Sequence, residues 1–407
     1  MKIIPAVLLI VLISTMTLAE RPPAPTADLA ARANNLFAAD LYRALKAKDG
    51  NLFFSPYSIT TALAMTREGA RKETSAEMDR VFYWIPRVPA AAHRALEVAL
   101  RPGTVREGHG EDAKELPAFG LSVANTLWAQ EGLAVQSSFT KVLADEFKAP
   151  LQRIDFQKTA AARKIINDWV AEHTRDRIKD IVPEDLPTAD TLFALANAIW
   201  FKAAWSDPFQ ERWTKDAAFT TGSGEAVTAP LMHRTGRYGY GETADAQILE
   251  MEYLGGETSM VVVLPKAKAG LPALEQKLDG AMLEQWIGAL GPQHVRVKFP
   301  RFEITCPTNL TDILPKMGMP RAFTAGKADF TGMTTAEPLV IGAVLHKAFV
   351  KVDEEGTEAA AATVVMMERT SAPQVQAEFT ADHPFLFLIR HRKTGAILFV
   401  GRVTDPR

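Results

Sequence analysis

Hydrophobic positions follow a helical period in several parts of the 407-residue chain. Apolar side chains recur on one helical face over 29–45, which predicts a helix there. Over 51–63, an apolar run, a capping Ser55 and a second apolar run predict a strand followed directly by a helix. The pattern over 165–182 predicts one amphipathic helix that ends near Pro183.

Other segments follow the period of a strand. Residues 121–128 are a strand candidate, and the long apolar run 191–202 is typical of a central strand that is buried on both faces. Two alternating runs around the glycine pair 255–256 predict a hairpin over 248–265. The alternation over 295–302 predicts one further strand.

The stretch 354–367 fits both periods. Its four consecutive alanines, 359–362, predict a short helix or a linker by propensity, with Thr357 as a cap. With a period of two, one face is small, uncharged and buriable, and glutamate falls only on the other face. Such a strand can enter a crowded sheet, because nothing bulky or charged on this face would block it. The face consists of Thr357, Ala359, Ala361, Thr363, Val365 and Met367.

Composition indicates a globular protein with a large core. Hydrophobic residues make up 47% of the chain, and Cys306 is the only cysteine, so an intrachain disulfide is excluded and packing must supply the stability. Cys306 lies in an apolar run and is predicted to be a packed residue rather than a nucleophile. A net charge of -2 with 23% charged residues gives no nucleic-acid or membrane signature.

The N-terminus has the three-part layout of a secretory signal peptide over 1–19, with one lysine, an apolar run and a small-residue cleavage pattern. A membrane anchor is the alternative, but the apolar run is shorter than the ~20 residues that span a bilayer. Removal of 1–19 would leave a proline-rich leader over 20–32 and one domain over 33–407 with no membrane span. We therefore expect a secreted or periplasmic protein in the extracellular space.

The chain lacks the motifs of the common hydrolases and nucleotide-binding enzymes. It has no Gly-x-Ser-x-Gly, no His-Glu-x-x-His, no P-loop and no Cys/His spacing suited to zinc. Asp382 and His383 are adjacent, but no serine in a recognisable elbow accompanies them. The sequence therefore predicts no enzyme, no metal site and no cofactor.

The stretch 354–363 resembles the proximal hinge of the reactive-centre loop of inhibitory serpins, and the resemblance extends along nearly the whole mature chain. Further matching motifs lie at 51–63, 191–209, 345–353 and 382–402. The resemblance implies the α+β serpin fold: a large central sheet A, sheets B and C, about eight to nine helices, and an exposed reactive-centre loop at about 354–378.

The resemblance also assigns structural roles to particular residues. Asn197, His346 and two serines align with the shutter of the central sheet, and Trp205 aligns with its breach, where the loop first enters. None of these roles is catalytic. The hinge comprises Glu354, Glu355, Gly356, Thr357, Glu358, Ala359, Ala360, Ala361, Ala362 and Thr363, and the shutter comprises Ser55, Ser58, Asn197 and His346.

The function implied is suicide-substrate inhibition of a serine protease, the partner with which a monomeric serpin forms a covalent complex. The family's spacing places the cut between Thr370 and Ser371, whereas a slip of one residue would place it between Arg369 and Thr370 and favour trypsin-like enzymes. The alternatives are a non-inhibitory binding or chaperone-like serpin and a cross-class inhibitor of cysteine proteases. The hinge favours inhibition, because none of its inward positions carries a charge or a proline.

Overall fold

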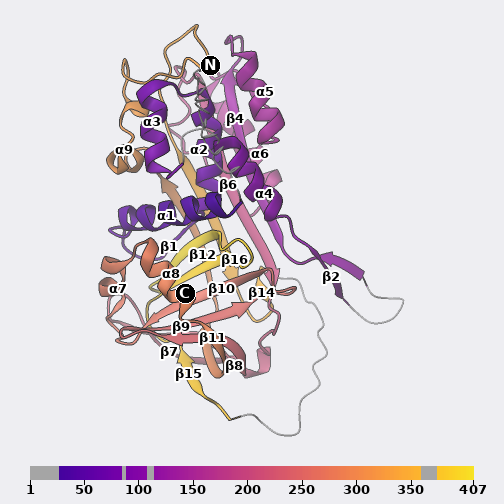
Figure 1. The fold of residues 1–407 in the computed structure, drawn as a ribbon, viewed down its shortest axis with the longest axis vertical. Coiled ribbons are helices and arrows are strands. Elements are labelled where there is room, and N and C mark those ends of the chain that lie inside the picture. The colour runs from indigo at the N-terminus through magenta and orange to yellow at the C-terminus, as the bar shows by residue number, and fades with distance from the viewer. Residues whose placement is uncertain (1–26, 85–88, 108–113, 359–373) are drawn as a thin grey trace, which may run out of the picture.

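A computed structural model of the chain describes residues 27–84, 89–107, 114–358 and 374–407. These residues form nine α-helices and three β-sheets, and the predicted α+β fold is confirmed (Figure 1). The helices are α1 (Ala27–Leu45), α2 (Pro56–Gly69), α3 (Lys72–Val81), α4 (Pro89–Ala99), α5 (Ser137–Glu146), α6 (Thr159–His173), α7 (Leu271–Lys277), α8 (Gly280–Gly288) and α9 (Ile313–Met317).

The central sheet has six strands, and the most N-terminal helices lie around its upper part (Figure 1). Its long strands β6 and β4 are antiparallel neighbours, whereas β13 runs parallel to β6 over four residue pairs, from Leu345↔Ala196 to Ala348↔Ile199. In spatial order the strands are β12 (Phe302–Asn309), β13 (Leu345–Val352), β14 (Gly356–Thr357), β6 (Phe193–Ala204), β4 (Gly120–Gln130) and β5 (Gln152–Ile154).

A nine-stranded sheet forms most of the lower half (Figure 1). The predicted sheets B and C are continuous within it, because the long strand β8 pairs with β7, β11 and β9 along its length. The strands are β1 (Leu52–Phe54), β17 (Ile397–Val403), β16 (Phe385–His391), β10 (Thr258–Pro265), β9 (Ala246–Glu252), β8 (Ala226–Glu242), β11 (Gly291–Pro300) and β15 (Ala377–Thr380), with β7 (Lys215–Thr220) beside β8. A separate two-stranded hairpin consists of β2 (Thr104–Glu107) and β3 (Lys114–Pro117).

The two large sheets share one hydrophobic core, and α2 passes through it. Ser55 caps α2 by accepting a hydrogen bond from Ser58 N, and Pro56 takes the first helical position, as the sequence predicts. Phe53 on β1 stacks on Phe399 and Phe387, with ring centroids 5.1 and 5.7 Å away. The buried start of α2 is therefore fixed against the C-terminal hairpin.

Three sequence-based predictions of local structure need correction. The helix predicted over 165–182 ends at His173. The Thr174 hydroxyl donates a hydrogen bond to Val170 O and accepts one from Ile178 N, and these bonds turn the chain away from the helix axis. The run 295–302 is not one strand, since β11 ends at Pro300 and β12 begins at Phe302. The pattern over 85–120 predicts an interrupted helix, but residues 104–107 and 114–117 of this region form the β2–β3 hairpin.

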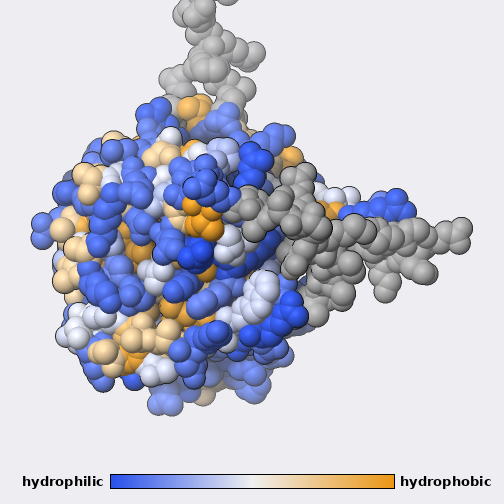
Figure 2. Space-filling view, turned by 90° about the horizontal axis from the view of Figure 1, so that it is seen from below, coloured by the Kyte–Doolittle hydropathy of each residue, from blue (hydrophilic) through white to orange (hydrophobic). Residues whose placement is uncertain are grey.

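The lower end of the molecule is covered mainly by hydrophilic residues, with a few separate hydrophobic patches (Figure 2). Within the described ranges, no helix is long and apolar enough to cross a membrane. Cys306 is buried, as predicted.

Candidate functional site

The candidate site is the place where the hinge meets the central sheet. β14 lies between the C-terminal ends of β13 and β6, at the lower end of the central sheet in Figure 1, with Thr357 opposite Val352 on one side and Ala203 on the other. The first hinge residues therefore form a strand rather than a helix. A Cβ at Gly356 would lie 2.1 Å from Ala203 O, so only glycine fits at this point.

Thr357 is held from below by an aromatic pair. Its hydroxyl lies 2.6 Å from the hydroxyl of Tyr253, and both residues are buried. Trp205 stacks on Tyr253 with ring centroids 4.6 Å apart and donates its indole N–H to Asp353 O at 3.0 Å. The small, polar side chain of Thr357 therefore fits a preformed buried position, which a larger or charged group would disrupt.

The turn that leads into β14 is fixed by its backbone carbonyls. Trp205 N donates to Glu355 O at 2.8 Å, and Phe209 N donates to Glu354 O at 2.9 Å. The structure thus places Trp205, the predicted breach residue, in direct contact with the hinge turn. The segment that follows β6 holds the turn through both its backbone and its side chains.

Glu354 forms a partly buried charged contact at the same turn. Its carboxylate lies 2.5 Å from Arg301 Nη2 and also accepts a hydrogen bond from the hydroxyl of Thr214. Burial raises the pKa of Glu354, but the hydrogen bonds from Arg301 and Thr214 outweigh burial and bring the pKa below its usual value. Glu354 therefore stays ionised and ties the hinge to the break between β11 and β12.

Glu358 is the last hinge residue in the described part of the chain. Its backbone has φ +50°, its N–H donates to Lys351 O at 2.9 Å, and its side chain forms an ion pair with Arg177. Burial raises the pKa of this carboxyl despite the nearby arginine. The positive φ turns the chain out of the extended conformation directly after β14.

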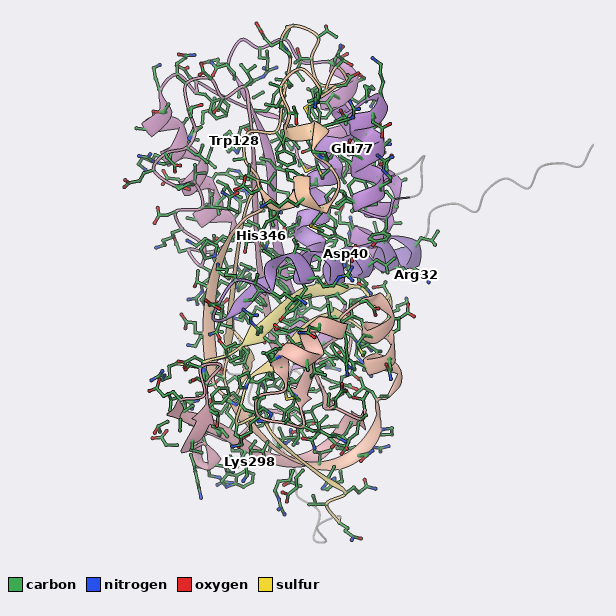
Figure 3. The ribbon with its side chains drawn as sticks, turned by 90° about the vertical axis from the view of Figure 1, so that its left-hand side faces the viewer. Arg32, Asp40, Glu77, Trp128, Lys298 and His346 are labelled. Carbon is green, nitrogen blue, oxygen red and sulfur yellow. The ribbon has the colours of Figure 1, made fainter. Side chains whose placement is uncertain are left out.

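A second polar cluster lies farther up the central sheet, where the N-terminal parts of β6 and β13 pair directly. His346 on β13 lies near the middle of the long axis of the molecule (Figure 3). Its Nε2 accepts a hydrogen bond from Ser55 N at 3.0 Å, so Nδ1 carries the proton and donates to Asn197 Oδ1 at 2.5 Å. Asn197 Nδ2 in turn lies 2.6 Å from Ser58 Oγ.

The four predicted shutter residues therefore form one buried network that joins α2, β6 and β13. Sequence reasoning missed its fifth member, Asn125 on β4, whose Oδ1 accepts from Asn197. Burial lowers the pKa of His346 to about 3, so this imidazole is neutral at physiological pH. Separation of β6 from β13 would break the bond between His346 and Asn197.

Other site residues could not be found from local sequence patterns. Tyr253, Arg301 and Arg177 contact the hinge from distant segments, and nothing in the local sequence indicates these contacts. The predicted reactive-bond residues Arg369, Thr370 and Ser371 and the hinge residues Ala359 to Thr363 lie outside the described residues.

A metal site and a hydrolase dyad at Asp382 and His383 would each require a specific arrangement of side chains. No group of three His, Cys, Asp or Glu side chains among them could hold a metal ion. His383 bonds to Asp382 through Nδ1 and to Pro265 O through Nε2, so its second nitrogen is not directed at a nucleophile.

Comparisons with known proteins agree on the family. A family model described as serpin (serine protease inhibitor) matches residues 32–406. An uncharacterised serpin-like protein of Thermococcus kodakarensis is 38% identical over 377 residues, which cover 92% of this chain and 85% of that protein. The structure of Serpin48, a highly specific serpin of the insect Tenebrio molitor, matches with a TM-score of 0.80 at 30% identity and covers 93% of this chain and 98% of Serpin48. Human thyroxine-binding globulin in complex with thyroxine matches with a TM-score of 0.81 at 27% identity and covers 94% of this chain and 100% of that one.

We expect His346→Gln to lower stability at pH 7 and to weaken the dependence of stability on pH. An unfolded histidine has a pKa of about 6.5. As pH falls below that value the unfolded chain takes up a proton that buried His346 does not, and stability is lost. Between pH 6 and 4 the wild type should lose ~1.4 kcal/mol more per pH unit than the variant. Urea unfolding at several pH values measures this difference, and parallel curves would contradict a buried neutral His346.

We expect Arg301→Met to destabilise the protein by ~1–3 kcal/mol, because it leaves the buried carboxylate of Glu354 without its cation. The matched control is Arg296→Met, which removes a solvent-exposed ion pair with Glu378 and should change stability by less than ~1 kcal/mol. Urea unfolding at pH 7 compares the two variants. Equal losses would show that Arg301 does not stabilise the hinge.

Proposed function

The chain belongs to the serpin family, and we propose that it is a suicide-substrate inhibitor of serine proteases. The observation that carries the proposal is β14, a hinge that already occupies the first positions of a future strand between β6 and β13. Serpins are generally protease inhibitors rather than catalysts, and the small inward face of the hinge is the feature that strand insertion requires.

In the proposed mechanism the protease attacks the reactive-centre loop as a substrate. Its serine oxygen adds to the carbonyl carbon of Thr370, or of Arg369 in the shifted alignment. The peptide bond breaks, the amine of the following residue leaves, and an acyl-enzyme ester remains. Cleavage frees the hinge side of the loop, which then extends β14 into the central sheet and carries the enzyme with it. Strand insertion of this kind is established for serpins.

Insertion must separate β6 and β13 where they pair directly with each other, on the N-terminal side of β14. The cost includes four residue pairs between β6 and β13 and the hydrogen bond from His346 to Asn197. A strand that makes ~15 new ladder bonds at ~1 kcal/mol each gains on the order of 10 kcal/mol. The gain therefore exceeds the loss, provided that no side chain on the inward face blocks the path.

The proposal extends to export and to domain boundaries. Cleavage of the signal peptide over 1–19 would release a leader at 20–32 and a serpin domain at 33–407, with the loop at about 354–378. We propose a secreted or periplasmic monomer whose partner is a serine protease, held in a covalent complex. Cysteine proteases are the cross-class alternative.

A second function is favoured by one of the similar structures. Thyroxine-binding globulin has the same fold and is complexed with thyroxine. A serpin can therefore act as a binding module, with its loop serving only as a substrate. For this chain the hinge separates the two functions, because insertion is needed for inhibition and not for binding.

The proposal is tested by incubating the mature protein with trypsin, elastase, chymotrypsin and subtilisin, followed by denaturing gels and intact mass measurement. We expect a covalent complex that survives denaturation and a released peptide that begins at Ser371 or Thr370. Cleavage by this panel without any complex would favour the binding module.

We expect Thr357→Arg to convert the inhibitor into a substrate, because a charged side chain cannot occupy the buried position beside Tyr253. More serpin should be cleaved per complex formed, while the rate of loop cleavage stays unchanged. The control is Thr228→Arg on the exposed face of β8, which should trap protease like the wild type. Trapping by Thr357→Arg at the wild-type stoichiometry would refute insertion through β14.

A further inference from the structure

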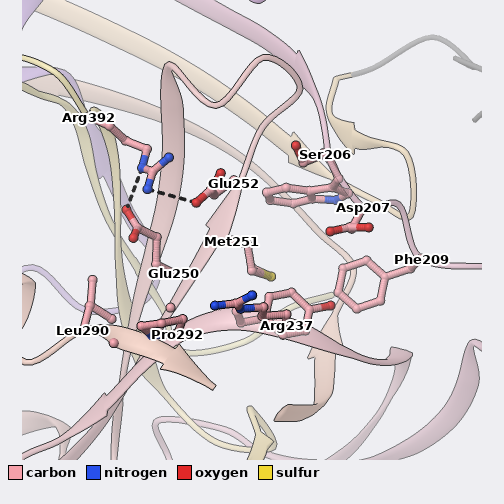
Figure 4. A pocket seen from close by; sticks show the side chains of 14 residues that line it. Ser206, Asp207, Phe209, Arg237, Glu250, Met251, Glu252, Leu290, Pro292 and Arg392 are labelled. Atoms are coloured by element: carbon pink, nitrogen blue, oxygen red, sulfur yellow. Dashed lines mark ion pairs between the residues drawn. The ribbon is translucent and has the colours of Figure 1, made fainter. Parts of the chain in front are cut away.

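A cavity of about 530 Å³ lies behind the hinge turn, among β8, β9, β11 and the segment that follows β6 (Figure 4). This volume falls within the ~300–1,000 Å³ of small-molecule sites. Leu290 and Pro292 lie at one end and Phe209 at the other, with Met251 and Arg237 between them (Figure 4). The indole of Trp205 completes the apolar part of the wall.

The charges that line the cavity leave one cation unpaired. Asp207 pairs with Arg234 at 2.7 Å. Glu252 and Glu250 lie 2.9 and 3.6 Å from Arg392, as the dashed lines in Figure 4 show. Arg237 is exposed and has no carboxylate partner among the described residues. An incoming anion would therefore meet a free guanidinium, while the carboxylates of the lining are already neutralised.

The wall also contains a buried polar group without a partner. Tyr238 is 8% exposed, and its hydroxyl forms no hydrogen bond with any described residue. Burial raises the pKa of Tyr238 to about 12, so the phenol remains a proton donor at neutral pH. An unpaired buried hydroxyl costs ~1–3 kcal/mol. The hydroxyl is enclosed by protein, so Arg237 remains the polar group that an incoming ligand meets.

The cavity shares residues with the anchor of the hinge. Trp205 and Phe209 line it, and the backbone N–H groups of the same two residues hold the carbonyls of Glu355 and Glu354. The indole of Trp205 also binds Asp353 O. A molecule packed against these two aromatic side chains would restrict the segment that fixes the hinge turn.

We propose that this cavity binds a small organic anion with a flat apolar body. The anionic group, a carboxylate or sulfonate, pairs with Arg237, and the body packs against Met251, Phe209 and Trp205. Occupancy stabilises the hinge turn in its present position. The regulatory meaning of this stabilisation rests on the proposed inhibitory function, whereas ligand binding itself does not.

The test uses 8-anilinonaphthalene-1-sulfonate as the probe, followed by its fluorescence. Arg237→Glu reverses the free charge and should weaken binding about tenfold. Gly291→Phe fills the cavity, since a Cβ at Gly291 would meet no heavy atom within 4 Å, and should abolish saturable binding. The control is Lys215→Glu, an exposed charge reversal on neighbouring β7 outside the cavity, which should leave binding unchanged.

The site is supported if the wild type binds the probe saturably, Gly291→Phe abolishes this binding, Arg237→Glu weakens it and Lys215→Glu leaves it unchanged. Absence of saturable binding, or equal weakening by Arg237→Glu and Lys215→Glu, overturns it. Hydrogen exchange tests the link to the hinge: the probe should slow exchange at the amides of Trp205 and Phe209 in the wild type but not in Gly291→Phe. Unchanged exchange with the probe bound would overturn the link. None of these readouts needs a protease, so failure of the inhibitory proposal leaves the result interpretable.

Discussion

The architecture depends on a steric constraint between two parallel strands. β6 and β13 pair directly toward their N-terminal ends and diverge toward their C-terminal ends, where Gly356 and Thr357 lie between them. The backbone of β6 lies too close to Gly356 for any side chain. Trp205 and Tyr253 hold this narrow wedge in place through hydrogen bonds to Asp353, Glu355 and Thr357. The central sheet is therefore closed at one end and already open at the other.

Beyond the wedge, where the strands pair directly, a single polar side-chain contact between His346 and Asn197 lies among apolar neighbours. A buried hydrogen bond contributes only ~0.5–1.5 kcal/mol net, so the bond between His346 and Asn197 is specific in geometry without being costly to break. Because the imidazole is neutral, no charge has to be moved when the strands part. A seam of this kind suits a sheet that must be stable as folded and must still accept another strand.

Local patterns predicted most of the elements but few of the contacts. The strand-and-cap pattern at Ser55 and Pro56 and the buried run of β6 appear where the sequence pattern predicts them, and the C-terminal hairpin appears where the family resemblance implies it. The predicted end of the helix that contains α6 was wrong, because hydrogen bonds of the Thr174 hydroxyl end the helix although the helical period of the sequence continues beyond it. Arg301 and Arg177 could not be foreseen, since each meets the hinge only through the fold and leaves no local pattern. The continuity of two sheets through β8 was missed for the same reason.

The register of β14 has a consequence for how the loop can vary in length. Side chains in a strand alternate between faces, and Thr357 already points inward. If β14 is extended by further residues, the inward or outward direction of each new side chain is set by the position of Thr357. Deleting or inserting one residue beyond Thr357 would therefore turn every later side chain to the opposite face, whereas a change of two residues would keep the faces and move the cleaved end by ~6.6 Å. Related loops should therefore tolerate insertions or deletions of two residues far better than those of a single residue. This preference follows from the two residues of β14, which already fix the alternation of side chains.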